Sequence, residues 1–184
     1  MSNIVYIAAS LDGFIADKDG GLNWLQSVPN PENSDLGFAD FLDSIDCIVM
    51  GRNTFETVAA MDIQWPYPKH VFVLSNALKS VPEKLKGRVE IIKGSPDEIT
   101  AMLDELGYER KYIDGGKTIQ IFLECDRIDE MIISRLPILL GGGTPLFGVL
   151  PEHLMFEHTA TDVLLNEIVV SRYRRKRLSA TEKK

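Results

Sequence analysis

The sequence is poor in residues that bind metals or form disulfides. It contains two cysteines and three histidines among 184 residues. Cys47 and Cys125 lie within apolar runs and outside any CxxC-like spacing, so we interpret both as small buried side chains in a reducing compartment. His70, His153 and His158 show no spacing typical of metal ligands. The sequence therefore predicts neither a disulfide nor a metal site.

Long apolar runs and an excess of basic residues are also missing. No run approaches the roughly 20 apolar residues that a bilayer-spanning helix needs, and the first residues do not resemble a secretion signal. Lys and Arg number 20 against 27 Asp and Glu, which gives a net charge of −7. This balance argues against general nucleic-acid binding. We expect a cytoplasmic protein with no membrane or nucleic-acid partner.

The length is that of one compact domain. A chain of 184 residues can bury roughly 70% of the surface that its unfolded form exposes. No repeat, low-complexity tract or linker divides the chain, so we predict a single domain over residues 1–175. Residues 176–184 form a basic C-terminal tail. We expect this tail to be solvated, although its charge is also compatible with contact to a polyanion.

Apolar runs alternate with helix-like segments along most of the chain. A helix with Ser95 as its N-cap and Gly107 as its stop follows the fourth run, and another helix covers Lys117–Glu124. This alternation predicts a largely parallel sheet covered on both faces. The runs with the composition of β-strands are Ile4–Ala9, Cys47–Met50, Val71–Leu74, Val89–Ile92, Lys111–Ile113 and Glu130–Ser134.

The C-terminal part of the chain differs from this pattern. Phe156–Val163 and Glu167–Tyr173 are strand-like runs around a short turn at Leu164–Asn166. Two such runs indicate an antiparallel hairpin. The predicted fold class is therefore α/β, with a mixed, mostly parallel sheet that ends in a C-terminal antiparallel hairpin.

Residues suited to an anion follow the second and third predicted strands. Gly51 allows a ligand to approach the backbone, and Arg52 offers a fork of donors that fits a phosphate. A helix that begins at Asn53 or Thr54 would add free backbone N–H groups. A phosphate could lie between Arg52 and Ser75. Arg52 is equally compatible with a surface Arg paired to a carboxylate, and a Ser such as Ser75 more commonly just ends a strand.

Glycines and small residues mark the ends of two further strands. Asp114–Thr118 places paired glycines at a helix start, where backbone N–H groups can bind a pyrophosphate. This segment matches neither GxGxxG nor GxxxxGK[ST], which disfavours the standard dinucleotide fold and the P-loop. The stretch Ala8–Ala16 contains small residues and an Asp12–Gly13 turn. It either lets a flat ring lie against the backbone or forms an ordinary turn.

Together these segments resemble the dihydrofolate reductase superfamily, in particular the branch that includes the reductase domain of the bacterial riboflavin deaminase-reductase. The resemblance covers nearly the whole chain and implies a three-layer α/β/α sandwich with a dihydrofolate reductase-like mixed sheet. Each motif is weak alone, but their order and spacing are specific. The matching motifs are SLDGFIA at 10–16, MGRNTFE at 50–56, VLS at 73–75, DGGKT at 114–118, and DEM at 129–131 leading to PILLGGGTPLF at 137–147.

The resemblance implies an NADPH site at the carboxyl ends of the strands. Ala8, Ile15 and Ala16 would lie against the nicotinamide. Arg52 and Ser75, beside Leu74 and Asn76, would hold the 2′-phosphate, because a cationic site with a serine favours NADPH over NADH. The pyrophosphate would be held by Gly51, Asn53, Thr54, Gly115, Gly116, Lys117 and Thr118.

Two carboxylates compete for the catalytic role. Asp35 stands at the spacing from Gly51 that the catalytic carboxylate has in dihydrofolate reductases, but it could also be a helix-capping carboxylate. Asp114 precedes the paired glycines, where the riboflavin-type branch has an acid. Asp12, Trp24, Asp35 and Ser134 form the predicted substrate site.

The resulting prediction is an NADPH-dependent reductase of a pyrimidine or pteridine-like substrate. It is most like 5-amino-6-(5-phosphoribosylamino)uracil reductase, without the separate deaminase domain. The alternatives are dihydrofolate reductase and a non-catalytic NADPH-binding sensor. The riboflavin-type relatives are often dimers, so we also expect a homodimer, with the apolar segment Pro137–Leu150 as its interface.

Overall fold

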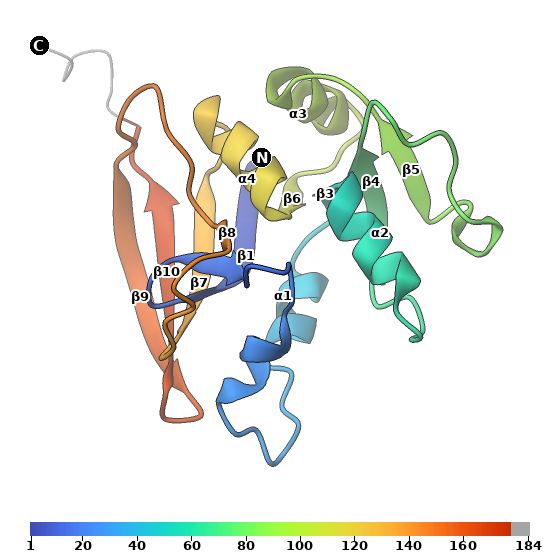
Figure 1. Ribbon diagram of the computed structural model, residues 1–184. Helices are drawn as coiled ribbons and strands as arrows, with labels where there is room; N and C mark the ends of the chain where they lie inside the picture. The colour runs from blue at the N-terminus through green and yellow to red at the C-terminus, as the bar shows by residue number, and fades with distance from the viewer. Residues whose placement is uncertain (178–184) are drawn as a thin grey trace, which may run out of the picture.

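The computed structural model describes residues 1–177, and strands from both ends of the chain share one eight-stranded sheet (Figure 1). The order of its strands is β5-β4-β3-β6-β1-β7-β10-β9. The first six strands in this order, from β5 through β7, run parallel to one another, whereas β10 is antiparallel to both β7 and β9. The strands are β1 (Ser2–Ser10), β3 (Cys47–Gly51), β4 (His70–Leu74), β5 (Val89–Ile92), β6 (Arg110–Asp114), β7 (Glu130–Leu136), β9 (Phe156–Leu164) and β10 (Ile168–Arg175).

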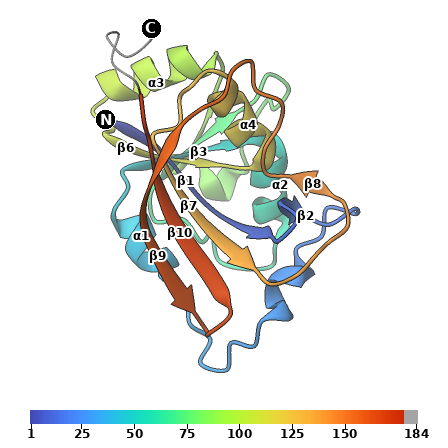
Figure 2. The same ribbon diagram turned by 90° about the vertical axis from the view of Figure 1, so that its left-hand side faces the viewer.

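Helices cover both faces of the sheet, which gives the three-layer sandwich that the sequence predicts (Figures 1 and 2). Alternate strand residues point to opposite faces. Val5 and Val49 belong to the core under α3 (Pro96–Glu105) and α4 (Gly116–Glu124). Ile48 belongs to the core under α1 (Phe38–Asp43) and α2 (Arg52–Ala60). The mixed, mostly parallel sheet with its antiparallel C-terminal hairpin is thus confirmed.

Helix boundaries follow local capping chemistry. The predicted N-cap Ser95 is confirmed, because its Oγ accepts a hydrogen bond from the backbone N–H of Glu98, and the Glu98 carboxylate accepts one from the backbone N–H of Ser95. Helix α2 begins at Arg52, just before the expected start at Asn53 or Thr54. The guanidinium of Arg52 therefore projects from the first turn of the helix.

The sequence pattern did not reveal several short elements near the edge of the sheet. Strand β2 (Phe14–Ala16) pairs with β8 (Thr144–Pro145). The two short 3₁₀ helices are η1 (Asn23–Ser27) and η2 (Glu83–Leu85). The β2–β8 contact depends on Gly143, whose φ is +136° and where a Cβ would collide with the Ala16 carbonyl. These elements bring the loop after β7 over the loop after β1 (Figure 2).

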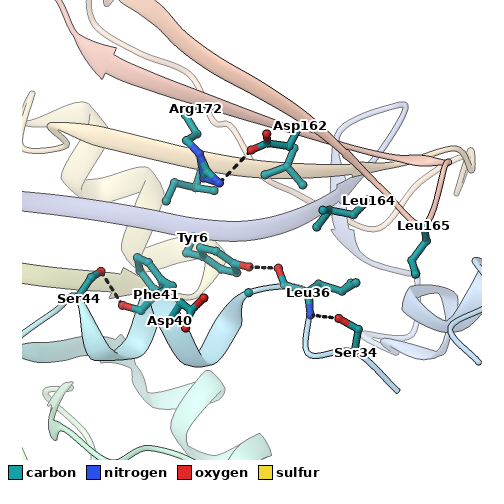
Figure 3. A pocket seen from close by; sticks show the side chains of 13 residues that line it. Tyr6, Ser34, Leu36, Asp40, Phe41, Ser44, Asp162, Leu164, Leu165 and Arg172 are labelled. Carbon is teal, nitrogen blue, oxygen red and sulfur yellow. Dashed lines mark hydrogen bonds and ion pairs between the residues drawn. The ribbon is translucent and has the colours of Figure 1, made fainter. Parts of the chain in front are cut away.

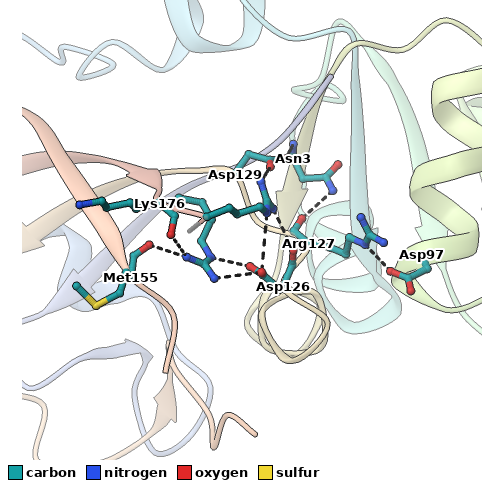
Figure 4. A network of polar contacts seen from close by, with 9 residues as sticks. Asn3, Asp97, Asp126, Arg127, Asp129, Met155 and Lys176 are labelled. Atoms are coloured by element: carbon teal, nitrogen blue, oxygen red, sulfur yellow. Dashed lines mark hydrogen bonds and ion pairs between the residues drawn. The ribbon is translucent and has the colours of Figure 1, made fainter. Parts of the chain in front are cut away.

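A polar network holds the end of β10 (Figure 4). Arg175 contacts Asp126 with two nitrogens, Nε–Oδ1 at 2.6 Å and Nη2–Oδ2 at 3.1 Å. Arg177 Nη1 donates to Asp129 Oδ1 at 2.6 Å, and Asp129 Oδ2 accepts from the backbone N–H of Asn3 at 2.8 Å. Arg175, at the end of β10, and Arg177, just beyond it, therefore both pair with carboxylates of the domain. The rest of the expected tail, residues 178–184, lies outside the described residues.

Asp126→Asn should destabilise the folded protein by about 1 to 2 kcal/mol, because the variant leaves the charge of Arg175 without a counterion. The Arg175 side chain is only 10% exposed. Asn also tolerates the left-handed backbone of residue 126, where φ is +53°. Urea unfolding measures the effect. The control Glu83→Gln, which removes an exposed ion pair with Lys86, should change stability by less than about 0.5 kcal/mol, and an equal loss in both variants would contradict the prediction.

Candidate functional site

A cleft of about 730 Å³ opens where several parallel strands end. We call it the main cleft. Open α/β sheets bind ligands at this edge, beyond the carboxyl ends of the strands. All the predicted cofactor residues except Ser75 and Asn76 line it: Ala8, Ile15, Ala16, Gly51, Arg52, Asn53, Thr54, Leu74, Gly115, Gly116, Lys117 and Thr118. Segments from four separate parts of the sequence thus meet around one cavity.

Two helix N-termini face the main cleft without side-chain caps. Neither Gly51 before α2 nor Gly115 before α4 provides a capping side chain. The first residues of both helices line the cleft, so their free backbone N–H groups and positive dipole ends are suited to phosphate oxygens. The sequence predicted these two turns as anion sites, and the fold places them around the same cavity.

Glycines allow these two turns to pack closely. A Cβ at Gly51 would lie 2.7 Å from Thr118 Oγ1, and a Cβ at Gly116 would lie 2.6 Å from Ile15 Cδ1. Gly115 has φ of +90°, and a Cβ there would collide with Thr54. Any larger residue would push the two turns apart. The glycine pair therefore shapes the wall of the main cleft.

Asp114 is the acidic residue of the main cleft. It ends strand β6, is partly buried, and accepts a hydrogen bond of 2.8 Å from the Gly115 N–H to Oδ1. Burial raises the pKa of Asp114 above its usual value, and contacts with Tyr112, the Gly115 N–H and Tyr67 oppose part of that rise. The Tyr112 hydroxyl also donates to the Tyr6 carbonyl at 3.0 Å. The site thus stabilises the protonated form of Asp114 more than water does around an exposed carboxyl.

Asp35 has the opposite environment. It is exposed, and its carboxylate accepts hydrogen bonds from the backbone N–H groups of Gly37 at 3.0 Å and Ala39 at 2.9 Å. These bonds lower the pKa of Asp35. Asp35 is not among the residues that line the main cleft. The geometry of Asp35 matches the helix-capping alternative, and its catalytic role stays a prediction.

Ser75 and Asn76 follow Leu74 at the edge of the main cleft. Ser75 is buried, and its Oγ accepts hydrogen bonds from the backbone N–H groups of Ala77 at 3.2 Å and Leu78 at 2.9 Å. Asn76 is exposed. Ser75 therefore shapes the turn after β4, while its hydroxyl proton remains available to an acceptor.

The other predicted substrate residues lie outside the main cleft. The Asp12 carboxylate accepts from Ser10 Oγ at 2.6 Å and from the Gly141 N–H at 2.7 Å, which ties the turn after β1 to the triple-glycine loop. Trp24 is buried in a cluster with Val28, Leu136, Ile168 and Val170. Ser134 pairs with Ala8 across β1 and β7. None of the three lines the main cleft. Their contacts in the structure are with other parts of the fold, and their role in substrate binding stays a prediction.

Sequence reasoning missed several other residues that line the main cleft. They include Tyr6, Leu22, Leu25, Thr57, Val58, Met61, Tyr67 and Tyr112. A signal existed for some of them. Val58 and Met61 follow Thr54 at the spacing of one helical face, and Tyr112 shares a strand face with Asp114.

A second cleft of about 490 Å³ lies between α1 and the β9–β10 hairpin (Figure 3). Its floor includes Tyr6 and Phe41, whose rings stack at 4.4 Å between centroids. Its rim carries Asp40 and the ion pair between Arg172 Nη2 and Asp162 Oδ2 at 3.1 Å. Tyr6 lines both clefts, and its hydroxyl donates to the Leu36 carbonyl at 3.2 Å. None of the predicted site residues lines the second cleft.

Residues 1–177 contain neither a metal-binding cluster of side chains nor a bilayer-spanning helix. No group of three or more His, Cys, Asp or Glu side chains in this range is arranged to hold a metal ion. No helix in the same range has the length and apolar character needed to cross a bilayer.

Comparison with known proteins agrees with this architecture. The profile of the RibD C-terminal domain matches residues 3–170. The chain belongs to the RibD C-terminal domain family. This confirms the resemblance to the dihydrofolate reductase superfamily and to its riboflavin-type reductase branch.

Three solved structures illustrate the relationship of this RibD family member to known folds. A candidate riboflavin biosynthesis protein of Shewanella sp. PV-4 is 52% identical, with a TM-score of 0.93 over 96% of this chain and 100% of that one. The deaminase and 5-amino-6-(5-phosphoribosylamino)uracil reductase of Thermotoga maritima is 14% identical, with a TM-score of 0.74 over 95% of this chain and 56% of that one. Dihydrofolate reductase of Enterococcus faecalis, complexed with NADP(H), is 21% identical, with a TM-score of 0.67 over 96% and 97%. The last two structures are too distant in sequence to show more than a shared fold.

Proposed function

We propose that this protein is an NADPH-dependent reductase of a pyrimidine or pteridine-like heterocycle, with Asp114 as the proton donor. The observation that carries the proposal is the convergence of two uncapped helix N-termini, Arg52 and a partly buried carboxyl around one cleft. Membership of the RibD C-terminal domain family supports it. The nearest functional comparison is 5-amino-6-(5-phosphoribosylamino)uracil reductase, the activity in the name of the Thermotoga relative.

The cofactor end of the main cleft fits NADPH. Arg52 and Lys117 carry positive charge at the helix starts, where the pyrophosphate and the 2′-phosphate need neutralisation. Ala8, Ile15 and Ala16 line the same cleft, and their side chains would lie against the nicotinamide. When bound, NADPH supplies a hydride from C4 of the nicotinamide.

The chain itself contributes alignment and a proton. The apolar walls of the main cleft exclude water and hold the substrate against the nicotinamide. Asp114, protonated over a wider pH range than an ordinary carboxyl, donates a proton to the nitrogen of the C=N bond that is reduced. Dihydrofolate reduction through Asp35 is less well supported, because Asp35 lies outside the cleft as a capping carboxylate.

A substrate screen tests the proposed function. The protein is incubated with NADPH and, in turn, a 6-ribosylamino-5-aminouracil, its 5′-phosphate and dihydrofolate, and oxidation of NADPH is followed by the nicotinamide absorbance. Turnover of either pyrimidine supports the proposal. Turnover of dihydrofolate alone would favour the dihydrofolate reductase alternative.

The proposed assembly is a homodimer through the segment 137–150. Leu139, Phe147 and Val149 are 69%, 45% and 90% exposed, which is unusual for such side chains on a free surface. We expect Val149→Glu to shift a dimer to a monomer in sedimentation experiments, because the change buries a charge in the interface. The control Thr159→Glu adds the same charge on β9 outside this segment. A wild-type protein that sediments as a monomer at all concentrations would contradict the assembly.

A further inference from the structure

Tyr67 is held firmly in the wall of the main cleft, although it belongs to no helix or strand. Pro66 and Pro68 restrict the backbone on both sides of it. Its carbonyl accepts a hydrogen bond of 3.2 Å from Arg88 Nη2, and its ring packs edge-on against Trp65 with 5.2 Å between the ring centroids. Tyr67 is only 6% exposed. Its position in the cleft is therefore set by contacts on every side of the residue.

The hydroxyl of Tyr67 meets the carboxyl of Asp114. Both residues line the main cleft, and the hydroxyl is a hydrogen-bonding partner of that carboxyl. Tyr112, two residues before Asp114 on the same face of β6, is a second hydroxyl partner. However, a hydroxyl has one proton, and that of Tyr112 already serves the Tyr6 carbonyl at 3.0 Å. Within residues 1–177, no acceptor other than Asp114 competes for the proton of Tyr67.

Proton transfer changes what the side chain of Asp114 needs from its surroundings. In the proposed reaction, the O–H bond of the Asp114 carboxyl breaks and an N–H bond forms on the substrate, as the neighbouring carbon receives the cofactor's hydride. A carboxylate is left in a partly buried site, and its oxygens can only accept hydrogen bonds. A donor already in place where negative charge develops lowers the barrier to such a step. The carboxylate then regains a proton from water.

We propose that Tyr67 is a positioning residue for this proton transfer, which holds the Asp114 carboxyl before the step and donates a hydrogen bond to its carboxylate afterwards. The inference rests on the proposed reductase function and deepens it. Tyr67 itself transfers no proton. Burial raises the pKa of its hydroxyl above the ordinary value, so Tyr67 keeps its proton and remains a donor throughout the reaction.

Titration of Asp114 tests the inference without turnover. Tyr67→Phe removes the hydroxyl and keeps a ring that can pack against Trp65. Because the contact with Tyr67 opposes the rise in the pKa of Asp114, the variant should raise that pKa further. ¹³C NMR of protein with labelled Asp carboxyls measures it in the absence of substrate, and Asp114→Asn assigns the signal. The charged groups that line the same cleft, Arg52 on α2 and Lys117 on α4, remain in the variant.

The rate of NADPH oxidation gives a second readout. In Tyr67→Phe, kcat should fall about 10- to 150-fold, the loss that corresponds to one hydrogen bond to a charged group. The affinity for NADPH should stay the same, and the pH at which the rate falls should move upward with the pKa of Asp114.

The matched control is Tyr108→Phe, which removes a hydroxyl from a ring that packs against Phe72 outside the main cleft. It should keep the wild-type titration and rate. An Asp114 titration that is the same in Tyr67→Phe and in the wild type would overturn the inference, and so would a kcat of Tyr67→Phe equal to that of the control. A shifted titration in a protein that oxidises no NADPH with any screened heterocycle would count against the proposed reductase function and uphold the pairing of Tyr67 with Asp114.

Discussion

Asp114→Asn should lower kcat by about 10² to 10⁴, the usual contribution of a positioned general acid. The substitution keeps the size of the side chain and its contact with the Gly115 N–H, but it removes the transferable proton. Binding of NADPH should be nearly unchanged. Stopped-flow measurement of nicotinamide oxidation separates the two quantities.

The pH dependence gives the same prediction a second readout. Because burial raises the pKa of Asp114, the wild-type rate should be highest at low pH and fall as the pH rises through that pKa. Asp114→Asn should lack this fall. The free energy of unfolding changes in the same direction. In the wild type it decreases as the pH rises from the ordinary Asp pKa through the raised pKa of Asp114, whereas the variant lacks this decrease. The control Asp35→Asn should retain the wild-type pH profile of the rate, and a loss of activity at Asp35 instead of Asp114 would contradict the assignment.

Arg52→Ala should weaken NADPH binding by about 10- to 150-fold, which corresponds to about 1.5 to 3 kcal/mol for a charged hydrogen bond. NADH binding should change little, because NADH lacks the 2′-phosphate. Fluorescence titration with each cofactor gives the ratio. Arg52 is exposed at the first turn of α2, so the variant should fold normally.

A matched comparison isolates the role of Arg52. Lys117→Ala removes the other cation of the cleft, at the start of α4, and should weaken NADPH and NADH to a similar degree if it serves the pyrophosphate. Equal weakening of both cofactors by Arg52→Ala would exclude Arg52 from recognition of the 2′-phosphate.

The cofactor end of the site could be predicted from the sequence because its residues follow directly on buried strands. Arg52 comes after β3 and the glycine pair after β6, so the parallel order of the strands brings them to one edge. Short-range patterns with a period of two or 3.6 residues carry this information. The predicted strands and helices were confirmed for the same reason.

The substrate end depends on contacts between distant segments. Tyr67 lies in the irregular chain between α2 and β4, and nothing local shows that it faces Asp114. Trp24 was predicted to contact substrate because it follows a glycine turn. In the structure its ring packs against Leu136 and Ile168, where burial of its large apolar surface stabilises the fold. Asp12 likewise finds its partners in the loop around Gly141.

We propose that NADPH binds in the main cleft and there transfers its hydride to a pyrimidine. A single-turnover stopped-flow experiment tests it most directly, with the protein loaded with NADPH and mixed with a 6-ribosylamino-5-aminouracil. We expect an exponential loss of the nicotinamide absorbance, which becomes slower when the transferred hydrogen at C4 is deuterium. Tight binding of NADPH with no oxidation by any pyrimidine or pteridine would contradict it and identify the protein as a cofactor-binding sensor.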